Sequence, residues 1–269
     1  MTKEQTMYRV VPESPKMSAL IYSEPGAGKT TLSSTAQDHE ALTPVLFANI
    51  EGGMLSIAHR RDIHAVDILS TEELRQLYYD LKHGEGPYGD VRTLVIDNVT
   101  ELQTRNLDEI VQLEVKAGRQ TDEDDIWQEN YGTSTVQLLR LFRWFKDLEI
   151  NLILTAHAKF VYPPTGKSRN AAAQLTAEPL AVLPMLTQKL CKSLMGMVNF
   201  VWFLQYDAEA DERRMLTRPD GIIQAKTRGP KFAKALGSVV VNPTLPALYD
   251  MLVKAESGKP DRDTKRRKK

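Results

Sequence analysis

The chain has 269 residues, 42% of them hydrophobic, which is enough to bury one substantial core, and we expect one large domain. Lys plus Arg equals Asp plus Glu at 35 each, so binding to nucleic acid must come from local patches rather than from net charge. Cys191 is the only cysteine, which excludes an internal disulfide and a cysteine-rich zinc site; we expect a small core residue. The sequence has neither a signal-peptide pattern nor an apolar run of membrane-spanning length, so we expect a soluble, cytoplasmic protein without a membrane partner.

Three segments are distinguished by composition. Residues 1–15 form a polar N-terminal extension, residues 16–255 form the core, and residues 256–269 form a disordered tail that closes with five basic residues. Such a tail either keeps the protein soluble or contacts nucleic acid, and the sequence does not decide between these roles.

Short apolar runs alternate with amphipathic stretches along the core, as in parallel strands joined by helices. Strands are predicted at residues 17–22, 44–50, 93–99, 151–157 and 199–206, each buried on both faces. Helices are predicted to start at residue 30 and to cover residues 71–83, 100–117, 133–148 and 244–255. Residues 213–229 predict two short strands that pair as a hairpin around Pro219-Asp220-Gly221. The fold class is therefore α/β, a mostly parallel, doubly wound sheet with a C-terminal β-hairpin extension.

Two helices have internal signals that fix their position. Ser70 is the expected N-cap of the helix at 71–83, with Glu73 completing a capping box and Gly84 ending the helix. In the helix at 133–148, core-facing spacing is assigned to Val136, Leu139, Phe142 and Phe145. The acidic stretch 121–129 is interpreted as a solvated lead-in, anchored to the core by Trp127 and Tyr131.

The stretch "SEPGAGKTT", residues 23–31, follows a predicted strand and opens a predicted helix. A phosphate-binding loop needs small residues whose N–H groups point inward, a lysine for the β- and γ-phosphates and a hydroxyl for Mg²⁺. The predicted nucleotide-binding residues are Glu24, Pro25, Gly26, Ala27, Gly28, Lys29, Thr30 and Thr31. Ser23 replaces the usual first glycine, and the alternative is a glycine-rich turn that binds nothing.

Acidic residues that complete such a site follow two other strands. Asp97 ends the strand "TLVIDNV", where an aspartate can hold Mg²⁺ together with Thr30; the alternative is a cap of the next helix. Asn98 stands where many ring ATPases carry a catalytic glutamate, so the base must come from elsewhere. Glu51, which ends the strand "FANIEGG", is the preferred base, and Glu101 is the rival.

The motifs "SEPGAGKTT", "FANIEGG", "TLVIDNVTEL" and "LILTAHAKF", in this order and spacing, resemble the RecA-type core ATPases. More narrowly, residues 16–253 are similar to phage-encoded RecA-like nucleotide-binding proteins, including the Sak group of single-strand annealing ATPases. The resemblance implies ATP and Mg²⁺ as ligands and single-stranded DNA as a partner, in phage recombination or strand annealing. It also implies a homo-oligomer, ring or filament, with shared ATP sites, a single-strand-binding protein as a further partner, and the host cytoplasm as location.

The same resemblance assigns further residues. His157 would report the γ-phosphate to the segment that follows, unless it is only a solvated strand-end histidine. Residues 159–195 are locally basic and irregular in their first half, which favours a DNA-binding loop or, alternatively, a mobile lid. Stacking and phosphate contacts are predicted for Lys159, Phe160, Tyr162, Lys167 and Arg169.

Lys226 and Arg228 form a Lys-x-Arg pair that resembles the element by which related subunits contact a neighbour's γ-phosphate; the alternative is a solvated basic hairpin. The preferred function is a Mg²⁺-dependent, RecA-type ATPase that acts on single-stranded DNA. A RecA-like helicase or helicase loader is one alternative, and a P-loop small-molecule kinase is another from a different class.

Overall fold

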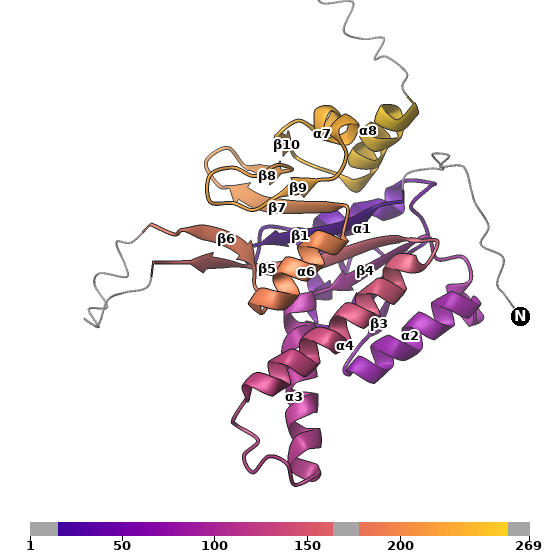
Figure 1. The fold of residues 1–269 in the computed structure, drawn as a ribbon. Coiled ribbons are helices and arrows are strands. Elements are labelled where there is room, and N and C mark those ends of the chain that lie inside the picture. The colour runs from indigo at the N-terminus through magenta and orange to yellow at the C-terminus, as the bar shows by residue number, and fades with distance from the viewer. Residues whose placement is uncertain (1–15, 164–177, 258–269) are drawn as a thin grey trace, which may run out of the picture.

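The computed structural model describes residues 16–163 and 178–257, and its centre is one twisted, mostly parallel sheet (Figure 1). The strands are β1 (Ser18–Ser23), β2 (Val45–Asn49), β3 (His64–Asp67), β4 (Thr93–Asp97), β5 (Asn151–Val161), β6 (Ala181–Pro184), β7 (Phe200–Asp207), β8 (Glu212–Leu216), β9 (Lys226–Thr227) and β10 (Val239–Val241). Their order is β10-β8-β7-β1-β5-β4-β2-β3, with β6 paired to β5 and β9 paired to β7.

All pairings from β7 through β1, β5, β4 and β2 to β3 are parallel, and the pairings of β6, β8, β9 and β10 are antiparallel. Every residue of β1 and β4 is buried, as expected for strands covered by helices on both faces. The five strands predicted from apolar runs are confirmed. The sheet places the carboxyl ends of β1, β4 and β2 at one edge, where ligands bind in open α/β folds.

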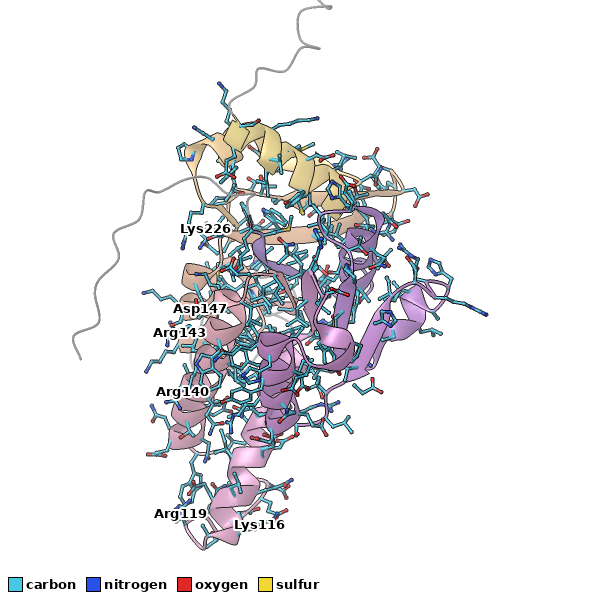
Figure 2. The ribbon with its side chains drawn as sticks, turned by 90° about the vertical axis from the view of Figure 1, so that its right-hand side faces the viewer. Lys116, Arg119, Arg140, Arg143, Asp147 and Lys226 are labelled. Atoms are coloured by element: carbon cyan, nitrogen blue, oxygen red, sulfur yellow. The ribbon has the colours of Figure 1, made fainter. Side chains whose placement is uncertain are left out.

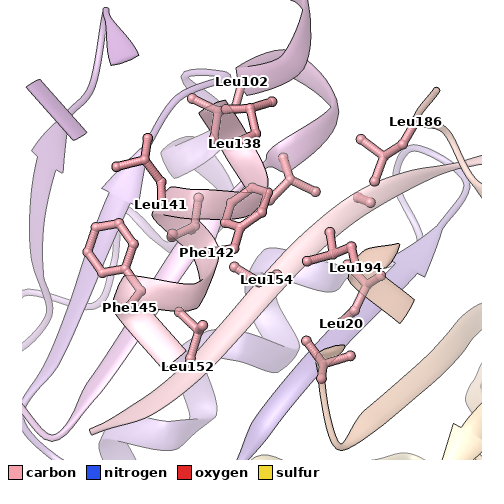
Figure 3. Packing of buried hydrophobic residues seen from close by; sticks show 14 of the residues in the cluster. Leu20, Leu102, Leu138, Leu141, Phe142, Phe145, Leu152, Leu154, Leu186 and Leu194 are labelled. Atoms are coloured by element: carbon pink, nitrogen blue, oxygen red, sulfur yellow. The ribbon is translucent and has the colours of Figure 1, made fainter. Parts of the chain in front are cut away.

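Helices cover both faces of the sheet. They are α1 (Lys29–Ser34), α2 (Thr71–His83), α3 (Val99–Lys116), α4 (Gln128–Asp147), α6 (Gln188–Met197), α7 (Pro230–Leu236) and α8 (Leu245–Ser257), and α1 continues as a 3-10 turn over Thr35–Asp38. Alternate side chains of β1 enter opposite layers: Leu20 and Tyr22 pack with α2, α3, α4 and α6, whereas Ala19 and Ile21 pack with α1, α7 and α8. Figure 3 shows the first layer, in which Phe142 and Phe145 of α4 lie against the sheet.

Two of the three signals predicted for α2, the Ser70 N-cap and the helix end at Gly84, are confirmed, whereas the predicted capping box is not formed. The Ser70 hydroxyl accepts a hydrogen bond from the Glu73 N–H at 3.1 Å, and Gly84 ends the helix in the left-handed conformation at φ 65°. The Glu73 carboxylate accepts from the Leu69 N–H, one residue before the position that a capping box would use.

Three residues expected in the core are exposed. Val136 is 54% exposed, Trp127 43% and Tyr131 38%, so the predicted anchoring of residues 121–129 by the two aromatic residues is wrong. Residues spaced three apart do not stay on one face of a helix that has 3.6 residues per turn. Val136 therefore lies outside the buried face on which Leu139 lies. Figure 2 shows Arg140, Arg143 and Asp147 following one another along α4, on which Val136 lies one turn before Arg140.

The C-terminal extension contains a β-hairpin, but not the one predicted. β8 pairs with β7 through the turn that connects Asp207 to Glu212, and β9 pairs with β7 farther along the same edge. The two strands on either side of Pro219 therefore pair with β7 and not with each other. Both lie against the wide buried edge of β7, which offers more apolar contact than a short isolated hairpin would.

The region 159–195 is more regular than predicted where the structure describes it. β5 continues to Val161, β6 returns antiparallel to it, and α6 follows from Gln188. Residues 1–15, the tail from 258 and residues 164–177 of the predicted DNA-binding loop lie outside the described residues. Within residues 16–163 and 178–257, no helix combines the length and apolar character needed to cross a membrane.

Candidate nucleotide-binding site

The predicted phosphate loop connects the carboxyl end of β1 to α1. Gly26 and Gly28 have φ angles of 81° and 97°, a region that favours glycine, so the two central glycines are required by the backbone. Ser23 instead lies in β1, in register with His157 on β5, and its backbone needs no glycine. The departure from the usual pattern is therefore compatible with the loop.

Lys29 is buried, with 7% of the residue exposed, and among the described residues its Nζ forms hydrogen bonds only with neutral oxygens. It donates to Ser23 Oγ at 3.0 Å, to Glu24 O at 3.3 Å and to Ser23 O at 3.5 Å. Burial lowers the pKa of Lys29, and the negative charges of Asp97 and Glu51 oppose this shift. A buried cation without an ion-pair partner among the described residues fits an anionic ligand.

Asp97 lies at the end of β4 beside the loop. The Thr30 hydroxyl donates to Asp97 Oδ2 at 2.6 Å, and the Thr155 hydroxyl of β5 donates to Asp97 Oδ1 at 2.5 Å. Asp97 and Thr155, which are buried, and Thr30, which is partly exposed, therefore form one polar cluster between three neighbouring elements. Thr155 was missed by the sequence analysis, although a polar residue two before His157 in an apolar strand shares its face and was a usable signal.

Glu51 follows β2, which pairs with the Asp97 strand as expected. The N–H groups of Ile50 and Glu51 donate to Asp97 O at 2.8 and 3.4 Å, which ties the turn after β2 to β4. The rival Glu101 lies in the first turn of α3 and forms an ion pair with Arg105 of the same helix at 3.1 Å.

Asn98 and His157 hold the Glu51 carboxylate. Asn98 Nδ2 donates to Glu51 Oε2, and His157 Nε2 lies 2.9 Å from Glu51 Oε1. Asn98 Oδ1 accepts from the Glu101 N–H, so Asn98 also caps α3. The residue in place of the usual glutamate thus orients the carboxylate that comes from β2.

These residues surround one cavity of about 560 Å³. It is lined by residues predicted for the site, namely Pro25, Gly26, Gly28, Lys29, Thr30, Thr31, Glu51, Asp97 and His157. Glu24 and Ala27 instead line a neighbouring hollow of about 300 Å³ together with residues of β7. Arg213 of β8 also lines the larger cavity and was not predicted, because no local motif marks it.

Lys226 and Arg228 lie elsewhere. Lys226 Nζ donates to the carbonyl oxygens of Met195 and Val198, and Arg228 donates to Gly196 O at 2.7 Å. Both cations therefore bind the carbonyl end of α6, a favourable position for positive charge. Their shared target is therefore within the same chain, and contact with a neighbouring subunit stays a prediction.

Of the residues predicted to bind DNA, the three that the structure describes have different surroundings. Lys159 lines an apolar cavity of about 700 Å³ beside α6, whereas Phe160 is partly buried against the core. Tyr162 is exposed, and Lys167 and Arg169 lie outside the described residues. Stacking on Phe160 is thus disfavoured, because its ring is already packed.

The donor set fits a nucleotide with Mg²⁺. Lys29 and the loop suit phosphates, while Thr30 and Asp97 are oxygen ligands of the kind that Mg²⁺ prefers beside phosphate groups. Among the described residues, no group of three or more His, Cys, Asp or Glu side chains forms a self-sufficient metal site. Phosphate oxygens and water must therefore complete the coordination of Mg²⁺.

Comparison with known proteins agrees with this geometry. A family model described as an AAA domain matches residues 15–229, which is most of the chain. No curated protein matches the chain. The matched span includes the loop, Glu51, Asp97, His157 and Arg213, and the chain therefore belongs to the AAA domain family of P-loop ATPases.

Proposed function

We propose that the protein hydrolyses ATP with Mg²⁺ and couples hydrolysis to binding of single-stranded DNA. The observation that carries the hydrolytic half is the Glu51 carboxylate, held by Asn98 and His157 at the wall of the cavity that contains Lys29. A carboxylate in this position accepts a proton from water as the water attacks the γ-phosphorus. The bond to the leaving ADP oxygen then breaks, and Lys29 stabilises the charge that develops on the phosphates.

Mg²⁺ bound by Thr30 and Asp97 would neutralise charge on the β- and γ-phosphates. Thr155 keeps Asp97 in place for this role, because its hydroxyl donates a hydrogen bond to Asp97 Oδ1, while Thr30 contacts the other carboxylate oxygen. No second carboxylate is needed for the metal, which leaves Glu51 free for the water.

The proposed coupling of hydrolysis to DNA binding is supported by the path of β5. His157 contacts Glu51 through its ring, and its carbonyl oxygen accepts from Met185 N at 2.7 Å, just after β6. β5 then continues through Lys159 to Val161, at the entrance to the basic segment 164–177. A change at the γ-phosphate thus has a short path to the segment for which DNA binding is proposed.

Hydrolysis measured with and without single-stranded DNA, at two salt concentrations, tests the proposal. Stimulation by DNA that weakens with salt is expected, because phosphate contacts release counterions. Glu51→Gln should bind ATP without turnover, while Glu101→Gln, which changes an exposed carboxylate on the neighbouring helix, should behave like the wild type. If single-stranded DNA does not change the rate of hydrolysis, the proposed action on nucleic acid is wrong. If Glu51→Gln hydrolyses ATP at the normal rate, Glu51 is not the base.

The finer setting is phage recombination or strand annealing by a ring or filament with a single-strand-binding protein, and it rests on the resemblance alone. Shared sites are tested by mixing Arg228→Ala with Lys29→Ala, each inactive by itself under this proposal. Recovery of activity in the mixture supports Arg228 acting in a neighbour's site. Without recovery, the contact of Arg228 with α6 is its whole role.

A further inference from the structure

Arg213 is fixed on the sheet at both of its backbone groups. It lies on β8 opposite Tyr206 of β7, its N–H donates to Asn242 Oδ1 at 2.9 Å, and its carbonyl oxygen accepts from Asn242 N at 2.7 Å. Asn242 directly follows β10, so the edge of the sheet holds Arg213 from the side away from the phosphate loop. Its side chain then reaches across to that loop.

The guanidinium of Arg213 occupies the space beside Gly28. Its Nε donates to Ala27 O at 3.3 Å, and its Cζ lies 5.8 Å from the centre of the Tyr206 ring. A Cβ atom built on Gly28 would lie 2.5 Å from this Nε, so a side chain at this position would displace the guanidinium from the loop.

The charge of Arg213 has no carboxylate partner among the described residues. The next residue, Arg214, pairs with Asp207 at 3.3 Å and with Glu212 at 3.7 Å, and the nearby Asp211 accepts a hydrogen bond from the Tyr206 hydroxyl at 2.6 Å. Arg213 nevertheless lines the 560 Å³ cavity together with Lys29. Its terminal amino groups are therefore available to an anion in that cavity.

The sheet order decides which phosphates lie near Arg213. β4 and β2, which carry Asp97 and Glu51, lie on one side of β1, and β7 and β8 lie on the other (Figure 1). If Glu51 activates the attacking water, the γ-phosphate would lie on the Glu51 side of the loop. The α- and β-phosphates would then lie nearer to β8.

We propose that Arg213 binds the α- and β-phosphates of the nucleotide held by its own chain, and this inference rests on the proposed function. A planar guanidinium can bind two phosphate oxygens at once, which favours a diphosphate group over a single phosphate. Because ADP and ATP share the α- and β-phosphates, Arg213 stabilises both nucleotides equally. It sets nucleotide affinity and does not sense the γ-phosphate.

Calorimetric titration of the full chain with ADP and with a non-hydrolysable ATP analogue, both with Mg²⁺, tests the proposal. Arg213→Ala should weaken both nucleotides about 10- to 100-fold, as expected for a lost charged hydrogen bond, and should keep their affinity ratio within about threefold. Arg214→Ala, the matched control on the same strand, should stay within about twofold of wild type. Unchanged affinity in Arg213→Ala, or a loss confined to the ATP analogue, would overturn the proposal.

Two further variants make the result unambiguous. Arg213→Gln keeps hydrogen-bonding capacity without the charge and should give an intermediate loss, so a folding defect in the alanine variant does not decide the matter. Lys29→Ala separates this inference from the proposed function. If Lys29→Ala abolishes binding while both Arg213 variants bind like wild type, only the role of Arg213 fails. If the wild type binds neither nucleotide, the proposed function fails together with this inference.

Discussion

Replacement of Ser23 by alanine tests how the unusual loop works. In the structure, Ser23 Oγ accepts a hydrogen bond from Lys29 Nζ at 3.0 Å, and both residues are buried. If Lys29 must leave this oxygen to bind phosphates, the serine stabilises the nucleotide-free protein and competes with the ligand. The substitution should then lower stability without nucleotide and raise nucleotide affinity.

The expected magnitude follows from the contacts of Lys29. A hydrogen bond to a charged group contributes about 1.5–3 kcal/mol to stability. Lys29 keeps the carbonyl oxygens of Ser23 and Glu24 as acceptors, at 3.5 and 3.3 Å, so the loss in Ser23→Ala should lie at the lower end, about 1.5 kcal/mol. The same difference, gained on binding, tightens the dissociation constant for ATP about tenfold.

Urea unfolding with and without a non-hydrolysable ATP analogue, together with calorimetric titration, measures both quantities. Ser33→Ala is the matched control, because Ser33 is also buried but its hydroxyl has no hydrogen-bond partner among the described residues. Its stability and affinity should stay near those of wild type. The reasoning is refuted if Ser23→Ala loses stability but binds ATP no more tightly than wild type, since Lys29 would then keep its serine contact in the bound state.

Three more predictions concern the site and the core. Thr155→Val removes the hydroxyl that lies 2.5 Å from Asp97 Oδ1, so half-saturation of hydrolysis should require about tenfold more Mg²⁺. Thr155→Ser keeps the hydroxyl and should behave like wild type. An unchanged Mg²⁺ titration of Thr155→Val would contradict this prediction. Burial raises the pKa of Cys191 to about 11, so little thiolate exists at pH 8, and an alkylating reagent should label it only as urea unfolds the protein; rapid labelling of the native state contradicts this. In urea titrations, Phe142→Ala should lower the free energy of unfolding by about 3–5 kcal/mol and Val136→Ala by less than about 0.5 kcal/mol. Equal losses of stability in the two variants would contradict the burial of Phe142 and the exposure of Val136.

The parts of the site that sequence could predict are local in the chain. Gly26, Gly28, Lys29 and Thr30 stand within five residues, and the backbone angles that require the glycines arise from the turn itself. Asp97 was also accessible, because a charged residue at the end of a buried apolar strand indicates that a ligand or a neighbouring group binds the charge. These inferences needed no knowledge of which strands are neighbours.

Roles that depend on strand order were not accessible, even where a local signal marked the residue, as the polar side chain in an apolar strand marked Thr155. Thr155 reaches Asp97 because β5 lies between β1 and β4, and Arg213 reaches the loop because β8 follows β7 at the other side. β3 was missed for a similar reason: its edge position leaves most of its residues exposed, so it shows no apolar run. The pairing partner of β9 likewise depends on the length of β7, which no signal near Pro219 encodes.

The sheet order also determines what hydrolysis changes in the proposed reaction. Contacts on the β8 side of the loop, including that of Arg213, are the same for ATP and ADP, because they involve the phosphates that both share. Loss of the γ-phosphate therefore changes contacts only on the other side of the phosphate loop, where His157 contacts Glu51. His157 belongs to β5, which continues past the sheet and pairs there with β6. The strand that carries His157 is thus the described element best placed to convert hydrolysis into a movement of residues 159–163.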